Sequence, residues 1–79
     1  MIRYYFNVRD GKDLPDDWGY EFQDLASARS EAVRMAGEIL RDGATGPLWD
    51  GTPWQMIVTS GPNWTGETIF VLNFSATQS

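Results

Sequence analysis

Residues 2–9 alternate between apolar and polar side chains, which is the pattern of a β-strand with one buried face. The apolar positions are Ile2, Tyr4, Phe6 and Val8. The intervening positions, which we expect to face water or a partner, are Arg3, Tyr5, Asn7 and Arg9. The turn residues Asp10 and Gly11 end this strand, and an exposed loop follows. A short second strand is predicted over residues 18–22, where Gly19 weakens the pattern and favours an edge position.

After Asp24 the alternation gives way to helical spacing, which predicts one amphipathic helix over residues 25–42. Its apolar stripe consists of Leu25, Ala28, Ala32, Met35, Ala36, Ile39 and Leu40. The carboxylate of Asp24 is suited to accept a backbone N–H of the first turn. Gly43 is suited to end the helix, because glycine adopts the left-handed cap conformation without strain.

Two more strands are predicted after a connection at residues 44–53 that is rich in Gly and Pro. Residues 54–59 alternate as a third strand. Residues 67–74 form a fourth, with apolar residues on both faces. That pattern is typical of a central strand, or of a strand whose outer face is covered by a partner.

These elements predict a two-layer α+β fold with the order β-β-α-β-β. A four-stranded, mainly antiparallel sheet would carry the single helix on one face. Residues 1–74 would form one domain and residues 75–79 a frayed tail. The connection lengths are compatible with two strand orders. The expected core consists of Ile2, Tyr4, Phe6, Val8, Leu25, Ala32, Ala36, Ile39, Leu40, Met56, Val58, Phe70 and Leu72.

The composition removes most chemistry from consideration, because the 79 residues include no cysteine and no histidine. Disulfides, thiolate nucleophiles and cysteine–zinc sites are excluded, and the commonest metal ligand is absent. We therefore expect a protein that is not an enzyme and that has no metal or cofactor. Its net charge of −5 argues against nucleic acid and anionic membranes as partners. No apolar run is long enough to span a membrane and no secretory signal is recognisable, so a cytoplasmic location is expected.

Two groups of charged residues are candidates for binding. Arg29 lies beside the apolar stripe of the helix, where a guanidinium needs water or a carboxylate. We prefer an ion pair with Asp10, Asp16 or Asp17, and an anion-binding arginine is the alternative. The acidic residues of the first loop offer oxygen ligands, but their spacing does not match a calcium loop. They are Asp10, Asp13, Asp16 and Asp17, and a solvated loop is the preferred interpretation.

Aromatic residues supply the other candidates. Tyr5 lies between Arg3 and Arg9 on one strand face, an arrangement that some single-stranded RNA readers use for stacking. Because the chain is acidic, we prefer pairing with a neighbouring strand or a second protomer. Trp49 and Trp64 fall in predicted loops, where each either covers an edge of the core or is offered to a partner.

Three segments resemble a family of small uncharacterised proteins of soil and root-associated, rhizobial-type alphaproteobacteria, a domain of unknown function. They are RYYFNVRDG (3–11), GYEFQDL (19–25) and ARSEA (28–32). Members open with an RY(F/Y)F(H/N)VxDG run and continue into a DLxxARxEA helix. The resemblance implies a single-domain, cytoplasmic bacterial protein and brings no activity, cofactor or catalytic residue. The matching positions Asp10, Gly19, Asp24 and Arg29 have structural interpretations, which are a turn, a close backbone approach, a helix cap and an ion pair.

Two functions remain as hypotheses. The first is a non-enzymatic interaction module that forms a homodimer, or binds another protein, through the open sheet face or an edge strand. The second is a regulatory or stress-linked protein that binds a small anionic ligand near Arg29 and Arg9.

Overall fold

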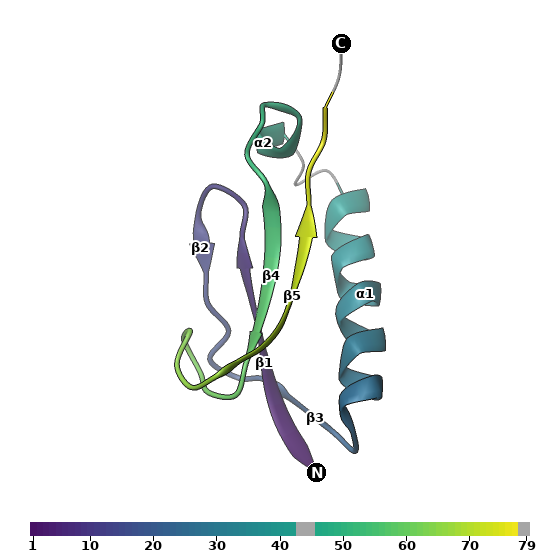
Figure 1. The fold of residues 1–79 in the computed structure, drawn as a ribbon, viewed down its shortest axis with the longest axis vertical. Coiled ribbons are helices and arrows are strands. Elements are labelled where there is room, and N and C mark those ends of the chain that lie inside the picture. Colours follow the sequence, from purple (N-terminus) through teal and green to yellow (C-terminus); the bar gives the residue numbers. More distant parts are fainter. Residues whose placement is uncertain (43–45, 78–79) are drawn as a thin grey trace.

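An antiparallel sheet and one long helix form the two layers of the protein (Figure 1). The structure is a computed structural model that describes residues 1–42 and 46–77. The strands are β1 (Ile2–Arg9), β2 (Asp13–Leu14), β3 (Tyr20–Phe22), β4 (Trp54–Thr59) and β5 (Thr68–Phe74). The helices are α1 (Leu25–Arg41) and the short α2 (Gly46–Trp49). The predicted α+β class is confirmed, although the sheet has five strands where four were expected.

The additional strand is β2, which lies in the loop that was expected to be irregular. The predicted strand at residues 18–22 shortens to β3, because Gly19 precedes it with a φ of 70° and breaks the extended backbone. The connection before β4 also contains more order than expected, since it includes α2.

β1 and β4 form the centre of the sheet, whose order is β2-β1-β4-β5. β3 pairs with the same edge of β1 as β2, but at the other end of that strand. Phe6 lies opposite Val58, and Val58 in turn lies opposite Phe70. A central position for residues 67–74 is therefore wrong, because β5 is an edge strand.

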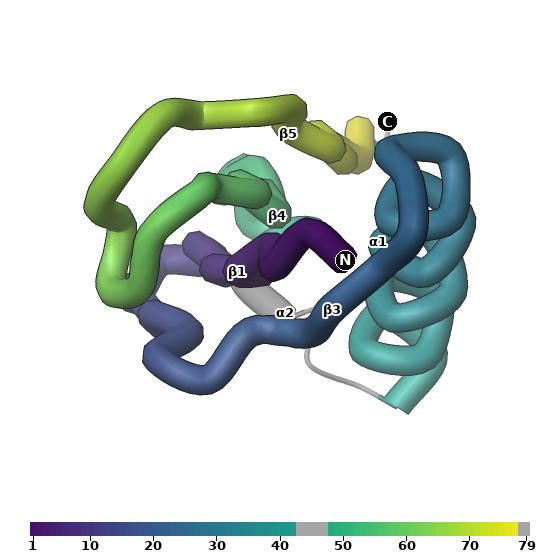
Figure 2. The backbone as a smooth tube through the Cα atoms, turned by 90° about the horizontal axis from the view of Figure 1, so that it is seen from below, coloured from purple at the N-terminus to yellow at the C-terminus, as the bar shows by residue number. Residues whose placement is uncertain are grey.

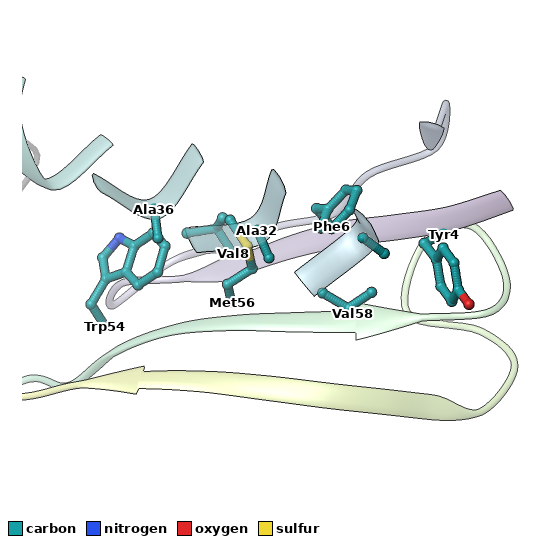
Figure 3. Packing of buried hydrophobic residues seen from close by; sticks show 9 residues of the cluster. Tyr4, Phe6, Val8, Ala32, Ala36, Trp54, Met56 and Val58 are labelled. Carbon is teal, nitrogen blue, oxygen red and sulfur yellow. The ribbon is translucent and has the colours of Figure 1, made fainter. Parts of the chain in front are cut away.

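The core lies between α1 and one face of the sheet (Figure 3). The helix contributes three fully buried alanines, whose small side chains let its backbone lie close to the strands. They are Ala28, Ala32 and Ala36. The sheet contributes Tyr4, Phe6 and Val8 from β1 and Trp54, Met56 and Val58 from β4.

The expected core differs from the observed one at three large side chains. Ile2 is 50% exposed and Leu25 is 39% exposed, because both lie at the end of the sheet where α1 only begins. Trp54 was not expected in the core, yet it is buried and packs edge-on against Phe74, with ring centroids 5.7 Å apart. Ile39, Leu40, Phe70 and Leu72 are half-buried at the margin of the core.

Asp24 caps the first turn of α1. Its Oδ1 accepts a hydrogen bond from the backbone N–H of Ser27 at 2.8 Å, and this bond lowers the pKa of the carboxyl. The last turn ends at Arg41, and the N–H of Asp42 donates to the carbonyl of Glu38. The expected stop at Gly43 lies outside the described residues.

Candidate functional site

The two edges of the sheet are built differently, and this difference defines the candidate site. At the β1 edge, β3 pairs with Ile2–Tyr4 and β2 pairs with Val8 and Arg9, which leaves a gap around Phe6. Asp16 fills this gap, because its Oδ2 accepts the backbone N–H of Phe6 at 2.9 Å. Its Oδ1 accepts the N–H groups of Trp18 and Gly19 at 3.0 and 3.1 Å. One carboxylate thus takes the place of the missing strand at this edge.

Asn7 continues this network into the sheet and is fully buried. Its Nδ2 donates to the carbonyl of Ile57 at 2.9 Å and to Oγ1 of Thr59 at 3.1 Å. Its Oδ1 accepts the N–H of Asp16 at 2.9 Å. Through these hydrogen bonds the side-chain amide connects β1, β4 and the β2–β3 connection. Its nitrogen serves as the donor and its oxygen as the acceptor. This role is structural, and the expectation that Asn7 faces water or a partner is wrong.

Loops cover Asn7 from the side opposite α1. Figure 2 shows that the β4–β5 hairpin loop and the β2–β3 connection both project away from the helix. The N–H of Asn63 in the hairpin loop donates to the carbonyl of Asp16 at 3.0 Å and so joins the two loops. The alternation of β1 places Asn7 on this face, but the covering loops are a tertiary feature.

The three candidate residues of β1 lie together on the face away from the helix. Arg3 is paired with Glu21 at 2.9 Å and Arg9 with Asp13 at 2.8 Å, and all four side chains are exposed. Tyr5 lies between the two arginines and is half-buried. Exposed ion pairs of this kind contribute little stability, so their main effect is to place charge along the β1 edge.

Trp64 is turned back over this face. The guanidinium carbon of Arg9 lies 4.9 Å from the centre of its ring, within cation–π distance. Trp64 is half-buried and has a φ of 69°, which is unfavourable for a bulky residue. The loop therefore holds this tryptophan over the sheet. Trp49 was also expected in a loop, but it is the last residue of α2 and is 53% exposed.

The structure does not bring Arg29 to the other candidates. Arg29 lies on α1, whereas the side chain of Arg9 lies on the sheet face opposite the helix. Among the described residues Arg29 forms no ion pair. The expected partner Asp16 is engaged with backbone amides, Asp10 accepts the N–H of Lys12, and Asp17 forms no ion pair among the described residues. The predicted ion pair between the first loop and the helix is wrong for this reason.

The acidic residues of the first loop are likewise separated. Asp13 faces Arg9, Asp16 faces backbone amides, and Asp10 closes its own turn. Within residues 1–42 and 46–77, no three Asp or Glu side chains are grouped as a metal site would require.

Gly19 permits the close approach of the β2–β3 connection to β1. A Cβ at this position would lie 2.8 Å from the carbonyl oxygen of Tyr4 and 2.9 Å from the ring of Tyr5. Gly19→Ala is therefore expected to destabilise the protein by about 1–3 kcal/mol. Gly37→Ala is the matched control, because that position on α1 has open space and a helix favours Ala over Gly by about 0.5–1 kcal/mol. Urea denaturation of both variants checks this, and a lower midpoint for Gly37→Ala than for Gly19→Ala would contradict it.

The β5 edge has none of the features that protect the β1 edge. β5 is seven residues long, and its sequence TIFVLNF contains no charge and no proline. In the part of the chain that the structure describes, no strand pairs with its outer side (Figure 2). Natural edge strands are usually short, charged or covered, since free edges pair with other strands. β5 is a long, uncharged and open edge, and the one irregularity in its ladder with β4 is a register shift near its start, opposite Val58 and Thr59.

The ladder identifies the backbone groups that β5 presents outward. The N–H and C=O of one residue in an antiparallel strand point to the same side, and neighbouring residues point to opposite sides. Because Phe6 donates to Asp16 at the outer edge of β1, its neighbour Asn7 points toward Ile57 of β4. Met56 and Val58 then point toward β5.

The same alternation continues into β5. Leu72 lies opposite Met56 and Phe70 lies opposite Val58, so the backbone groups of both point toward β4. The backbone groups of Val71 and Asn73 consequently point away from the sheet. These outward N–H and C=O groups form a row of donors and acceptors to which another strand can bind. The side chain of Val71 is 37% exposed.

A protein-family model described as a domain of unknown function, DUF6894, matches residues 3–75. The match covers nearly the whole chain, so the protein belongs to this family. No curated protein and no solved structure matches the chain. Neither helix of the described residues has the length and apolar character needed to cross a membrane.

Proposed function

We propose that the protein is a non-enzymatic interaction module that binds an extended chain segment at the β5 edge by β-strand addition. The observation that carries this proposal is the contrast between the two edges. The β1 edge is divided between two short strands and closed by the Asp16 carboxylate, whereas β5 is long, uncharged and unpaired. Main-chain hydrogen bonds give such complexes their affinity, so no deep pocket is required.

Two other observations support this edge over the open sheet face as the binding surface. The hairpin loop and Trp64 already occupy part of that face, and Arg3 and Arg9 on the same face are held in ion pairs. An anionic ligand held jointly by Arg29 and Arg9 has no support, since the two side chains lie on opposite sides of the sheet. We also propose a cytoplasmic, bacterial protein of the rhizobial type, on the strength of the sequence motifs.

Amide hydrogen exchange on β5 tests strand addition directly. The probe is a synthetic peptide with the sequence TIFVLNF flanked by lysines, titrated into the dilute protein. We expect the amides of Val71 and Asn73 to exchange more slowly as peptide is added, because they acquire acceptors. The amides of Phe70 and Leu72 are the internal control, since they already point toward β4. Unchanged exchange at Val71 and Asn73, with millimolar peptide and also with millimolar protein alone, would contradict the proposal.

A further inference from the structure

We propose that the strand added to β5 is β5 of a second copy of this chain, antiparallel and related by a two-fold axis through Val71. This inference rests on the proposed function and names its partner. The axis would stand perpendicular to the sheet, because residues directly opposite in an antiparallel pair point to the same face. The two sheets would join into one, with both α1 helices on the same side.

Backbone geometry makes the edge complementary to itself. Val71 is the central residue of Thr68–Phe74, and its N–H and C=O point outward. Two copies meeting at Val71 would exchange two main-chain hydrogen bonds there. The backbone groups of Asn73 also point outward, whereas at Ile69 the β4–β5 ladder shifts register, so the regular pairing would run from Phe70 to Leu72 of each copy.

Side chains on the helix face support the same register. Phe70 and Leu72 are half-buried there, at the margin of the core. With Val71 on the axis, Phe70 of each copy lies opposite Leu72 of the other. The two apolar margins would then continue into each other, and surface that one copy leaves partly open would be removed from water.

Charge is compatible with self-pairing even though each copy carries −5. β5 has no charged residue, and the nearest charge along the chain is Glu67. With Val71 on the axis, the two Glu67 residues are eight strand positions apart, which corresponds to about 27 Å. That distance exceeds the Debye length of ~8 Å at physiological ionic strength, so the repulsion between them is screened. If two copies paired through the β1 edge instead, the charged residues along that edge would face the charged residues of the second copy.

Edge pairing alone buries less than the ~1,600 Å² of a standard stable interface. We therefore expect a dimer whose population depends on protein concentration.

Light scattering on a concentration series tests the dimer, with Val71→Lys as the main variant. Two lysines would meet on the axis, and we expect the dissociation constant to rise by about tenfold or more. Val33→Lys is the matched control, because Val33 is 60% exposed on α1 and the substitution adds the same charge away from the edge. Wild type and Val33→Lys should approach twice the monomer mass at high concentration, while Val71→Lys should need at least a tenfold higher concentration to reach the same average mass.

The outcomes separate this inference from the proposed function. A wild-type monomer at millimolar concentration whose Val71 amide is still protected by the peptide would overturn self-pairing and leave strand addition intact. A Val71→Lys protein that dimerises like wild type would overturn the β5 interface. Should circular dichroism show that Val71→Lys is unfolded, Asn73→Lys replaces it, since Asn73 also points outward and is exposed. Dimerisation of a folded Asn73→Lys with wild-type affinity would equally count against the interface.

Discussion

Asn7→Asp is expected to destabilise the protein by about 3–5 kcal/mol at neutral pH. Asn7 is fully buried, and its Nδ2 donates to the carbonyl of Ile57 and the hydroxyl of Thr59. A carboxylate at this position has no hydrogen to donate and places negative charge against the Ile57 carbonyl oxygen. This loss is comparable with the total free energy of unfolding of a small domain, which amounts to roughly 0.05–0.15 kcal/mol for each residue.

This destabilisation should depend on pH with a defined sign. Burial beside a carbonyl raises the folded-state pKa of the introduced carboxyl above its unfolded value, because only the neutral acid can donate a hydrogen bond there. The folded state therefore holds the proton more tightly. The variant should be most stable below the unfolded pKa of the carboxyl and lose stability as pH rises toward the folded pKa.

Urea denaturation at acidic and neutral pH measures this effect. Asn63→Asp is the matched control, because Asn63 is an exposed asparagine of the β4–β5 hairpin loop, away from the β5 edge, and the same charge is added there in water. Asn63→Asp should resemble the wild type in its pH dependence. Equal unfolding midpoints for the two variants at neutral pH would show that Asn7 is not the buried donor that we describe.

Asp16→Ala is expected to lower the free energy of unfolding by about 2–4 kcal/mol, since three backbone N–H groups lose the carboxylate that accepts their hydrogen bonds. The amide of Phe6 is the important one, because it belongs to a central strand and has no strand partner at that edge. The N–H groups of Trp18 and Gly19 lie nearer to water and can be solvated more readily. Asp16→Asn should be intermediate, because its amide keeps one acceptor oxygen in place of two.

Thermal unfolding combined with amide exchange distinguishes this role from a general effect of charge. Asp17→Ala removes the same charge from the neighbouring exposed position and should change stability little. In Asp16→Ala the Phe6 amide should exchange faster than in the wild type. A Phe6 amide that stays fully protected in that variant would mean that another group accepts its hydrogen bond.

Local pattern was sufficient to predict β1, α1 and β4, because each has one face that is uniformly apolar. The alternation of β1 placed Tyr4, Phe6 and Val8 in the core, where the structure has them. The period of a strand specifies which side chains share a face, but it does not specify what covers that face. Asn7 was therefore assigned to the wet side, although loops from two distant segments bury it.

Pairing between strands was beyond the reach of the sequence pattern. β5 has apolar residues on both faces, which suggested the centre of the sheet, yet it forms an edge. The role of Asp16 was equally hidden, since a carboxylate that replaces a strand resembles any acidic loop residue. A sequence signal for the network did exist in Asp16, which lies two positions before Trp18, the spacing of an Asx-type turn.

The position of β1 beside β4 has a consequence for the order in which the chain assembles. Asn7 and Ile57 are neighbours in the sheet but 50 positions apart along the chain, with all of α1 between them. The helix can form from local contacts within microseconds, whereas the central pair must first close a long loop. During synthesis, the apolar side of the first strand emerges early and stays unpartnered until the fourth strand leaves the ribosome. We therefore expect truncated chains that end before β4 to contain helix without the β1–β4 pair, and to aggregate more readily than the full chain.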